Sequence, residues 1–175
     1  MRRFSLLIAT ALAAQVLGLA SHASAQTTTS DPAGFGGLSQ EASEQVNITA
    51  DDLAVDENAS TAQFTGNVEV VQGTMTLTAP ELVASYGEGG PSDLEEFTAS
   101  GGRVRMEFDA QTVDADQAYY DFAQRVLTFT GDVVVVNQTG TVNAARLVID
   151  TRAGTSSFSS GESGGRVTST FTPGG

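Results

Sequence analysis

The sequence predicts an all-β domain, built as a sandwich, a barrel or a solenoid-like roll. Three observations support this prediction. Apolar and polar residues alternate with period 2 along most of the chain, which is typical of half-buried strands. Turn-forming residues separate these stretches about every 8–12 residues. The chain also contains an internal repeat.

The repeat aligns Ile48–Tyr86 with Val113–Thr151 without a gap, each residue i with residue i + 65, and 14 of the 39 positions are identical. Its centre aligns Phe64–Val71 with Phe129–Val136. A repeat in a β-rich chain indicates one strand unit stacked on a copy of itself. Each copy then buries apolar surface that it could not bury alone.

The predicted strands follow one another through the repeat. Asp114–Arg125 has some helical character, but its alignment with Thr49–Ser60 favours strand and turn. Glycine-containing breaks separate the strands. In chain order, the alternating segments contain Leu53 and Val55, Phe64–Val70, Met75 and Leu77, Leu82 and Ala84, Val104–Phe108, Leu127–Val135, and Leu147 and Ile149.

Gly66 and Gly131 occupy equivalent positions inside predicted strands, each followed by Asn or Asp. A glycine there indicates a bulge, a sharp bend or the close approach of another backbone. A bend at the same place in both copies suits a rolled sheet. A hairpin turn at each glycine is the alternative.

The first residues resemble an export signal. Arg2 and Arg3 precede an apolar stretch, and Ala23–Ala25 forms an A-x-A site, so residues 1–25 are predicted to be a signal peptide cleaved before Gln26. A retained membrane anchor is the alternative. Residues 26–45 are predicted to be a flexible leader, and residues 46–172 the folded domain.

The amino-acid composition excludes several kinds of catalytic, metal-binding and crosslinked site. The net charge of −13 becomes −15 once Arg2 and Arg3 are removed with the signal, because residues 1–25 contain no acid. The chain has no Cys or Lys, and its single His22 lies in the signal. Disulfides, Ser–His catalysis and zinc are therefore excluded for the mature chain. Nucleic-acid binding does not suit this acidity. We expect no enzymatic activity, no cofactor and no metal.

Two groups of carboxylates are candidates for sites. The acidic loop at Glu88–Glu96 suits a solvated loop better than a calcium site, because it lacks a calcium-loop pattern. Asp51 with Asp116, and Asp56 with Asp121, are repeat-equivalent pairs. Paired carboxylates can hydrolyse glycosides, but residues of this type at repeated turns are more simply turn formers.

The ordered series of strands resembles the LptA/OstA-like family of periplasmic lipopolysaccharide-transport proteins. The resemblance is carried by Ile48–Asp52, Ala62–Gly73 and Leu77–Leu82 in the first copy, and by Ala115–Asp121 and Leu127–Val136 in the second. The closing segments Ala145–Gly154 and Gly165–Val167 also resemble the end of that domain. Together they cover nearly the whole mature domain.

The resemblance implies an open β-jellyroll of many short antiparallel strands with an apolar interior. It implies a carrier that moves lipopolysaccharide from the inner to the outer membrane, with acyl chains inside the roll. It also implies LptC-like and LptD-like jellyroll partners and head-to-tail homo-oligomers. The mature chain departs from the family in having no Lys, which leaves headgroup contacts to Arg or to the backbone.

The candidate lipid groove consists of the apolar residues expected to face inward. Ordinary core packing is the alternative for each of them. Burying one methylene group contributes about 0.8 kcal/mol, so lipid tails would bind strongly in such an interior. The candidates are Val55, Phe64, Val68, Val70, Leu77, Leu82, Val104, Met106, Phe108, Tyr120, Leu127, Phe129, Val133, Val135, Val142, Leu147 and Ile149.

Arg103 and Arg105 lie two apart on one strand and project to the face opposite Val104. They are candidates for lipid phosphates, and pairing with nearby acids is the alternative. The terminal strands of an open roll have free edges for β-augmentation. The edge candidates are Val46, Ile48, Val167 and Phe171.

The sequence thus predicts a periplasmic lipid carrier. Two alternatives remain open at this stage. One is a structural or adhesive β-repeat protein with a solid core and no ligand. The other is a membrane-anchored LptC-like partner, which would keep its N-terminal anchor.

Overall fold

The structure is a computed structural model and describes residues 35–41, 44–161 and 165–172. The predicted signal peptide and the leader up to residue 34 lie outside the described residues. The elements are η1 (Phe35–Gly37), α1 (Leu38–Glu41), β1 (Val46–Thr49), β2 (Asp52–Asp56), β3 (Thr61–Gln72), β4 (Met75–Tyr86), η2 (Gly90–Ser92), β5 (Leu94–Ser100), β6 (Val104–Phe108), β7 (Gln111–Ala115), β8 (Gln117–Asp121), β9 (Val126–Asn137), β10 (Gly140–Asp150), β11 (Thr155–Ser159) and β12 (Thr168–Phe171).

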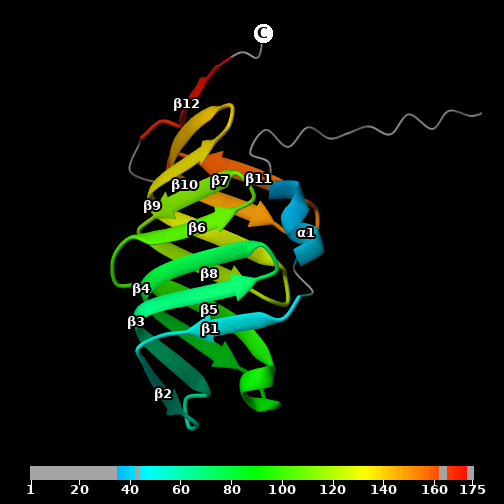
Figure 1. The fold of residues 1–175 in the computed structure, drawn as a ribbon, viewed down its shortest axis with the longest axis vertical. Helices are drawn as coiled ribbons and strands as arrows, with labels where there is room; N and C mark the ends of the chain where they lie inside the picture. The colour runs from blue at the N-terminus through cyan, green and yellow to red at the C-terminus, as the bar shows by residue number, and fades with distance from the viewer. Residues whose placement is uncertain (1–34, 42–43, 162–164, 173–175) are drawn as a thin grey trace, which may run out of the picture.

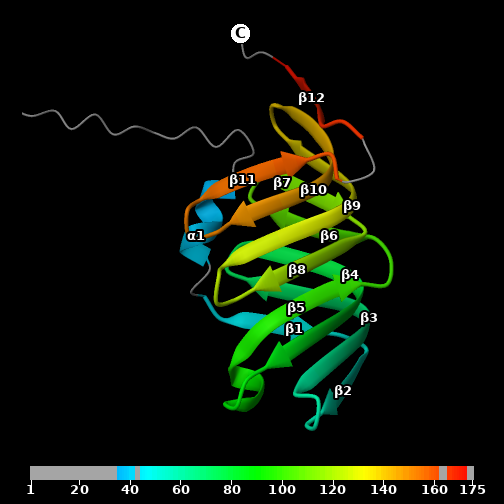
Figure 2. The ribbon, with the colours of Figure 1, turned by 180° about the vertical axis from the view of Figure 1, so that it is seen from behind.

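The strands form a single 12-stranded antiparallel sheet that is rolled into two facing layers. Layer 1 runs β2-β3-β4-β5-β8-β9-β10-β11 and faces the viewer in Figure 2. Layer 2 runs β1-β3-β4-β6-β7-β9-β10-β12 and faces the viewer in Figure 1. The long strands β3, β4, β9 and β10 belong to both layers, so each must bend where it passes from one to the other. The all-β prediction is confirmed.

The bends in β3 and β9 are bulges inside continuous strands. Gly66 (φ 78°) and Asn67 (φ 47°) both take the left-handed conformation, as do Gly131 (φ 78°) and Asp132 (φ 42°). The pairing with the neighbouring strand shifts register at both places. Glycine adopts this conformation at little cost, and Asn and Asp tolerate it better than most residues. Gly66 and Gly131 therefore form bends within their strands and not hairpin turns.

Two repeat-equivalent aspartates hold these bends. The Asp51 amide donates to the Gly66 carbonyl (2.8 Å), and the Asp51 carboxylate accepts a hydrogen bond from the side-chain amide of Asn67 (2.8 Å). In the second copy the Asp116 amide donates to the Gly131 carbonyl (2.9 Å). A Cβ atom at either glycine would collide with the neighbouring carboxylate. Asp51 and Asp116 therefore act as bend-forming residues.

The apolar core lies between the two layers. Every described buried apolar residue belongs to a strand except Phe35 and Leu38, which are 0% and 3% exposed. Part of the predicted leader, η1 and α1, thus packs against the core. Two large apolar side chains at positions i and i+3 anchor this short segment to the core.

We expect Gly131→Ala to lower the free energy of unfolding by more than about 2 kcal/mol. A left-handed alanine alone costs about 1–2 kcal/mol, and the new methyl group must also displace the Asp116 carboxylate. Gly90→Ala is the matched control, because Gly90 has φ 75° and open space around its Cβ position. Urea denaturation followed by circular dichroism measures both, and equal losses would contradict the role of the carboxylate.

Candidate functional site

The enclosed interior is the candidate site, and most of the predicted groove residues line it. Fourteen of the seventeen are buried in one continuous apolar cluster. They come from β3, β4, β6, β8, β9 and β10, so both layers and both copies contribute. These residues are Val68, Val70, Leu77, Leu82, Val104, Met106, Phe108, Tyr120, Leu127, Phe129, Val133, Val135, Leu147 and Ile149.

The other three predicted groove residues differ. Phe64 and Val142 are half-buried and pack against the cluster. Val55 is 52% exposed and is not part of the buried cluster. Val55 does lie on the inner face of the sheet, because it pairs with the buried Ala62. It is exposed because β2 is the last strand of layer 1 and no neighbouring described strand extends the wall beyond it.

The interior has an open side, where the strand ends of the two layers stand apart. An aromatic cluster of Phe97, Tyr120 and Phe122 forms the wall of layer 1, with ring centroids 4.6–6.0 Å apart. Val70 and Met75 are on the opposite wall, in layer 2. A small cavity of about 20 Å³ lies between these walls, which is room for about one water molecule.

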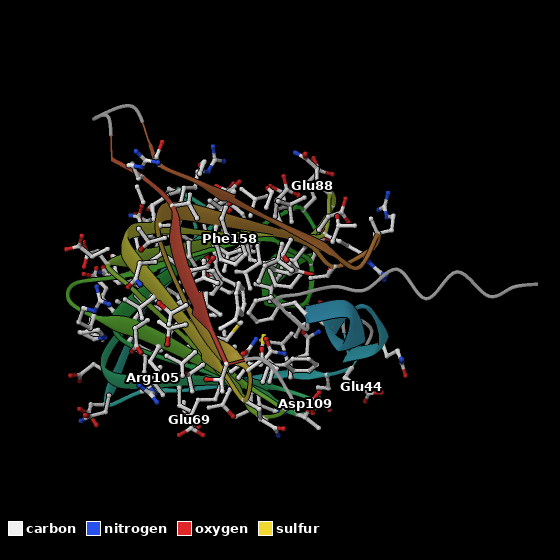
Figure 3. The ribbon with its side chains drawn as sticks, turned by 90° about the horizontal axis from the view of Figure 1, so that it is seen from above. Glu44, Glu69, Glu88, Arg105, Asp109 and Phe158 are labelled. Carbon is white, nitrogen blue, oxygen red and sulfur yellow. The ribbon has the colours of Figure 1, made fainter. Side chains whose placement is uncertain are left out.

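The chain's own leader fills this opening. Leu38 lines the remaining cavity directly, and Phe35 is fully buried. Gly37 lies so close to the Phe108 ring that a Cβ atom at this position would stand 2.9 Å from the ring carbon Cζ. In the view down the roll, α1 lies at its side, between Glu88 above and Asp109 below (Figure 3). In this conformation the interior is therefore filled with side chains.

Sequence reasoning missed the residues at the opening. Phe35 and Leu38 were overlooked because the leader is otherwise polar, although their i, i+3 spacing on a short apolar stripe was a usable signal. Phe97 and Phe122 were overlooked because each lies near a polar turn with little alternation around it. The alternation placed Met75 in a strand but gave no sign that it would line the groove.

The outer face carries the charged groups. Arg103 forms an ion pair with Asp116 (2.9 Å), and Arg105 pairs with Glu107 (2.9 Å) and Asp114 (3.1 Å). The hydrogen bond that Arg105 donates to Glu107, with the nearby charge of Asp114, raises the pKa of Arg105. Both guanidinium groups are thus paired with acids, which was the alternative to a phosphate role. Exposed pairs of this kind contribute little to stability.

Tyr119 also lies on the outer face. Its hydroxyl donates to a Glu96 carboxylate oxygen at 2.5 Å. This hydrogen bond raises the pKa of Tyr119 to about 12, with a smaller contribution from burial. Neutral Tyr119 therefore links β8 to β5 throughout the physiological pH range.

Other kinds of site find little support in the described part of the chain. Within residues 35–41, 44–161 and 165–172, no three acidic, His or Cys side chains come together to hold a metal ion. Over the same ranges, no helix is long and apolar enough to cross a membrane. Asp56 and Asp121 accept backbone N–H groups of their own turns, from Asn58 (2.9 Å) and Gln124 (2.8 Å), as turn formers do.

Both ends of the roll present apolar side chains and free strand edges. Among the described strands, β1 and β2 pair only with β3, whereas β11 and β12 pair only with β10. The exposed fractions of Leu53, Val167 and Phe171 are 57%, 41% and 50%. Val46 and Ile48 of β1 are half-buried. Val46, Ile48 and Phe171 therefore lie on terminal strands, and Val167 directly precedes one.

Comparison with known proteins identifies the family. The family model for LptA and the LptD N-terminal domain, described as an LPS transport protein, matches residues 47–155 and again residues 112–173. The chain belongs to this family. The two matches begin at residues 47 and 112, each one residue before a copy of the repeat.

Two relatives agree with this assignment. An uncharacterized protein of Rhizobium meliloti (strain 1021) is 30% identical over 137 residues, which are 75% of this chain and 73% of that protein. The crystal structure of LptH from Pseudomonas aeruginosa is similar with a TM-score of 0.65 and 18% identity, over 76% of this chain and 99% of that one. LptH is the LptA-homologous periplasmic component of a lipopolysaccharide transport device. At this identity the likeness shows the jellyroll fold.

We expect the repeat-equivalent phenylalanines to differ in their effect on stability. Phe129→Ala removes a fully buried ring and should lower the free energy of unfolding by about 3–5 kcal/mol. Phe64→Ala removes a half-buried ring and should cost about 1–2 kcal/mol. Urea denaturation of both variants tests this, and a larger loss at Phe64 would contradict the observed burial.

Proposed function

We propose that this protein carries lipopolysaccharide through the periplasm from the inner to the outer membrane, with acyl chains held between the two layers. Membership of a family of LPS transport proteins is the observation that carries the proposal. The interior supports it, because its walls are apolar and strand ends of both layers border the cavity that the leader covers.

The chemistry of the chain favours a carrier over an enzyme. The mature sequence offers no His or Cys, and its aspartate pairs are used in bends and turns. An apolar interior recognises acyl chains through burial of methylene groups, which needs no specific polar contact. A series of similar apolar positions along the roll would let a tail move from one to the next.

A structural protein with a solid core is the second candidate, and the filled interior favours it. The two functions differ in their response to lipid. A carrier binds lipopolysaccharide stoichiometrically and releases a bound apolar dye to it, whereas a solid-core protein binds neither.

A photo-crosslinking residue at Phe64 or at Phe129 should form adducts with lipopolysaccharide, because both side chains face the interior. The same residue at the exposed Thr78 of β4 is the control and should give none. Adducts are detected by the mass shift on a gel. Absence of adducts at both interior positions, with the crosslinker active elsewhere, would overturn lipid carriage.

We also propose head-to-tail assembly, and the internal repeat suggests its geometry. Leu53 and Val55 of β2 are exposed, whereas their repeat equivalents, Ala118 and Tyr120 of β8, are buried. The difference is that β5 pairs with β8 and no described strand pairs with the outer edge of β2. In an assembly, β11 of the next molecule would cover β2 as β5 covers β8.

The second layer suggests a specific register. Inside the chain β6 pairs with β7, and Met106 lies opposite Val113. The repeat-equivalent edges are β12 and β1. Met106 pairs with Leu77, and Ser169 pairs with Val142, the repeat equivalent of Leu77, so Ser169 of one molecule would lie opposite Ile48 of the next. A heterologous contact of this kind extends into a filament and does not close into a dimer.

The charge distribution favours the same polarity. Residues 44–102 contain eleven carboxylates and no Arg. The chain after Ala123 contains Arg125, Arg146, Arg152 and Arg166 against three acids. One end of the roll is therefore strongly acidic and the other is not, so head-to-tail contacts bring unlike ends together.

We expect Ile48→Cys and Ser169→Cys, placed on separate molecules and mixed, to form an intermolecular disulfide. Directly opposed residues on antiparallel strands have the Cα separation that a disulfide needs, and the natural chain has no cysteine to compete. Ile48→Cys mixed with Thr170→Cys is the control, because Thr170 is on the opposite face of its strand from Ser169. Non-reducing gels report the product, and equal yields from both mixtures would contradict the register.

A further inference from the structure

The leader segment Phe35–Glu41 has the position and the few attachments of a removable plug. It supplies the only described buried apolar side chains that do not belong to a strand. A strand side chain cannot leave the interior without breaking its ladder. Phe35 and Leu38 can leave by movement of two short helical turns.

The plug lies where an acyl chain would have to lie. Leu38 contacts the same cavity as Met75, Tyr120 and Phe122 at the open side of the roll. With the plug in place, the cavity of about 20 Å³ cannot admit a lipid tail. Removal of Phe35 and Leu38 would leave a space lined by apolar and aromatic side chains, which suits a saturated acyl chain.

The fit of the plug depends on one small residue. Gly37 brings the leader backbone against the Phe108 ring, and a Cβ atom there would stand 2.9 Å from the ring. Beyond the plug, a hydrogen bond from the Gln72 side chain to the Glu44 carbonyl (3.1 Å) fixes the start of the domain. Helix α1 has four residues, too few to be stable without its contacts to the core.

We propose that Phe35–Glu41 is a resident plug of the acyl-chain site, and that an incoming acyl chain displaces Phe35 and Leu38 and takes their place. The proposal rests on the lipid-carrying function proposed above. The plug keeps the apolar interior covered while the carrier is empty. It also reduces the apparent affinity for lipid by the fraction of molecules in which the site is closed.

Displacement can be observed directly, because the chain has no tryptophan. Phe35→Trp provides a single tryptophan, whose emission should be at short wavelength in the free protein. Titration with a long-chain fatty acid, and separately with lipopolysaccharide, should shift the emission to longer wavelength as the residue enters water. Phe158→Trp is the matched control, since Phe158 is half-buried on β11 and belongs to a strand. Its emission should not move to longer wavelength.

Two kinds of undocking variant give an independent test. Phe35→Ala with Leu38→Ala removes the buried side chains, and Gly37→Val adds a collision with Phe108. Both should lower the apparent Kd for a fluorescent fatty acid by at least about fivefold, because more molecules are open. Gln40→Ala, on the exposed side of α1, should leave the Kd unchanged. Circular dichroism verifies that each variant keeps its β-sheet.

The outcomes distinguish failure of the plug proposal from failure of the proposed lipid-carrying function. Fatty-acid binding without an emission shift in the Phe35→Trp variant would overturn the plug and leave lipid carriage intact. Undocking variants that bind no more tightly than the natural chain would do the same. Failure of the natural chain and of every undocked variant to bind fatty acid or lipopolysaccharide would overturn both.

Discussion

The two-layered roll depends on the left-handed bends at Gly66–Asn67 and Gly131–Asp132. Each bend lets one long strand leave the first layer and enter the second without losing its neighbours. The Asp51 and Asp116 amides donate to the carbonyls at the bends, and their carboxylates occupy the space that a side chain would need. An enclosed interior, and therefore any binding of lipid inside it, requires these two glycines.

A sheet folded in this way closes on one side and stays open on the other. The closed side needs no cover, because the bent strands continue through it. The open side would expose an aromatic wall to water, and the leader provides the cover. Ordering a short segment costs conformational entropy, which opposes the gain from burying its two side chains. A cover made in this way can protect the interior and still be exchanged for a better apolar ligand.

Period-2 alternation and the repeat predicted the strands, their inner faces and the bends, because these follow from local backbone geometry. Fourteen of the residues expected to face inward are buried in the apolar cluster. Val55 shows the limit of the method. Alternation tells which face a side chain is on, but only tertiary structure tells whether another strand covers that face. Phe35 and Leu38 show the converse, since a polar leader gave little local sign that a distant core would bury them.

The same limit explains why identical residues at equivalent positions of the two copies differ in burial. Phe64 and Phe129 stand at equivalent positions, yet only Phe129 has strands on both sides of its unit and is fully buried. A repeat at the end of a stack lacks a neighbour, and it must be capped, tolerate exposure or acquire a partner. In this chain Leu53 and Val55 of β2, and Phe171 of β12, are exposed to solvent. Because these side chains lie on inner faces, a partner that covers them would also extend the apolar interior from one molecule into the next.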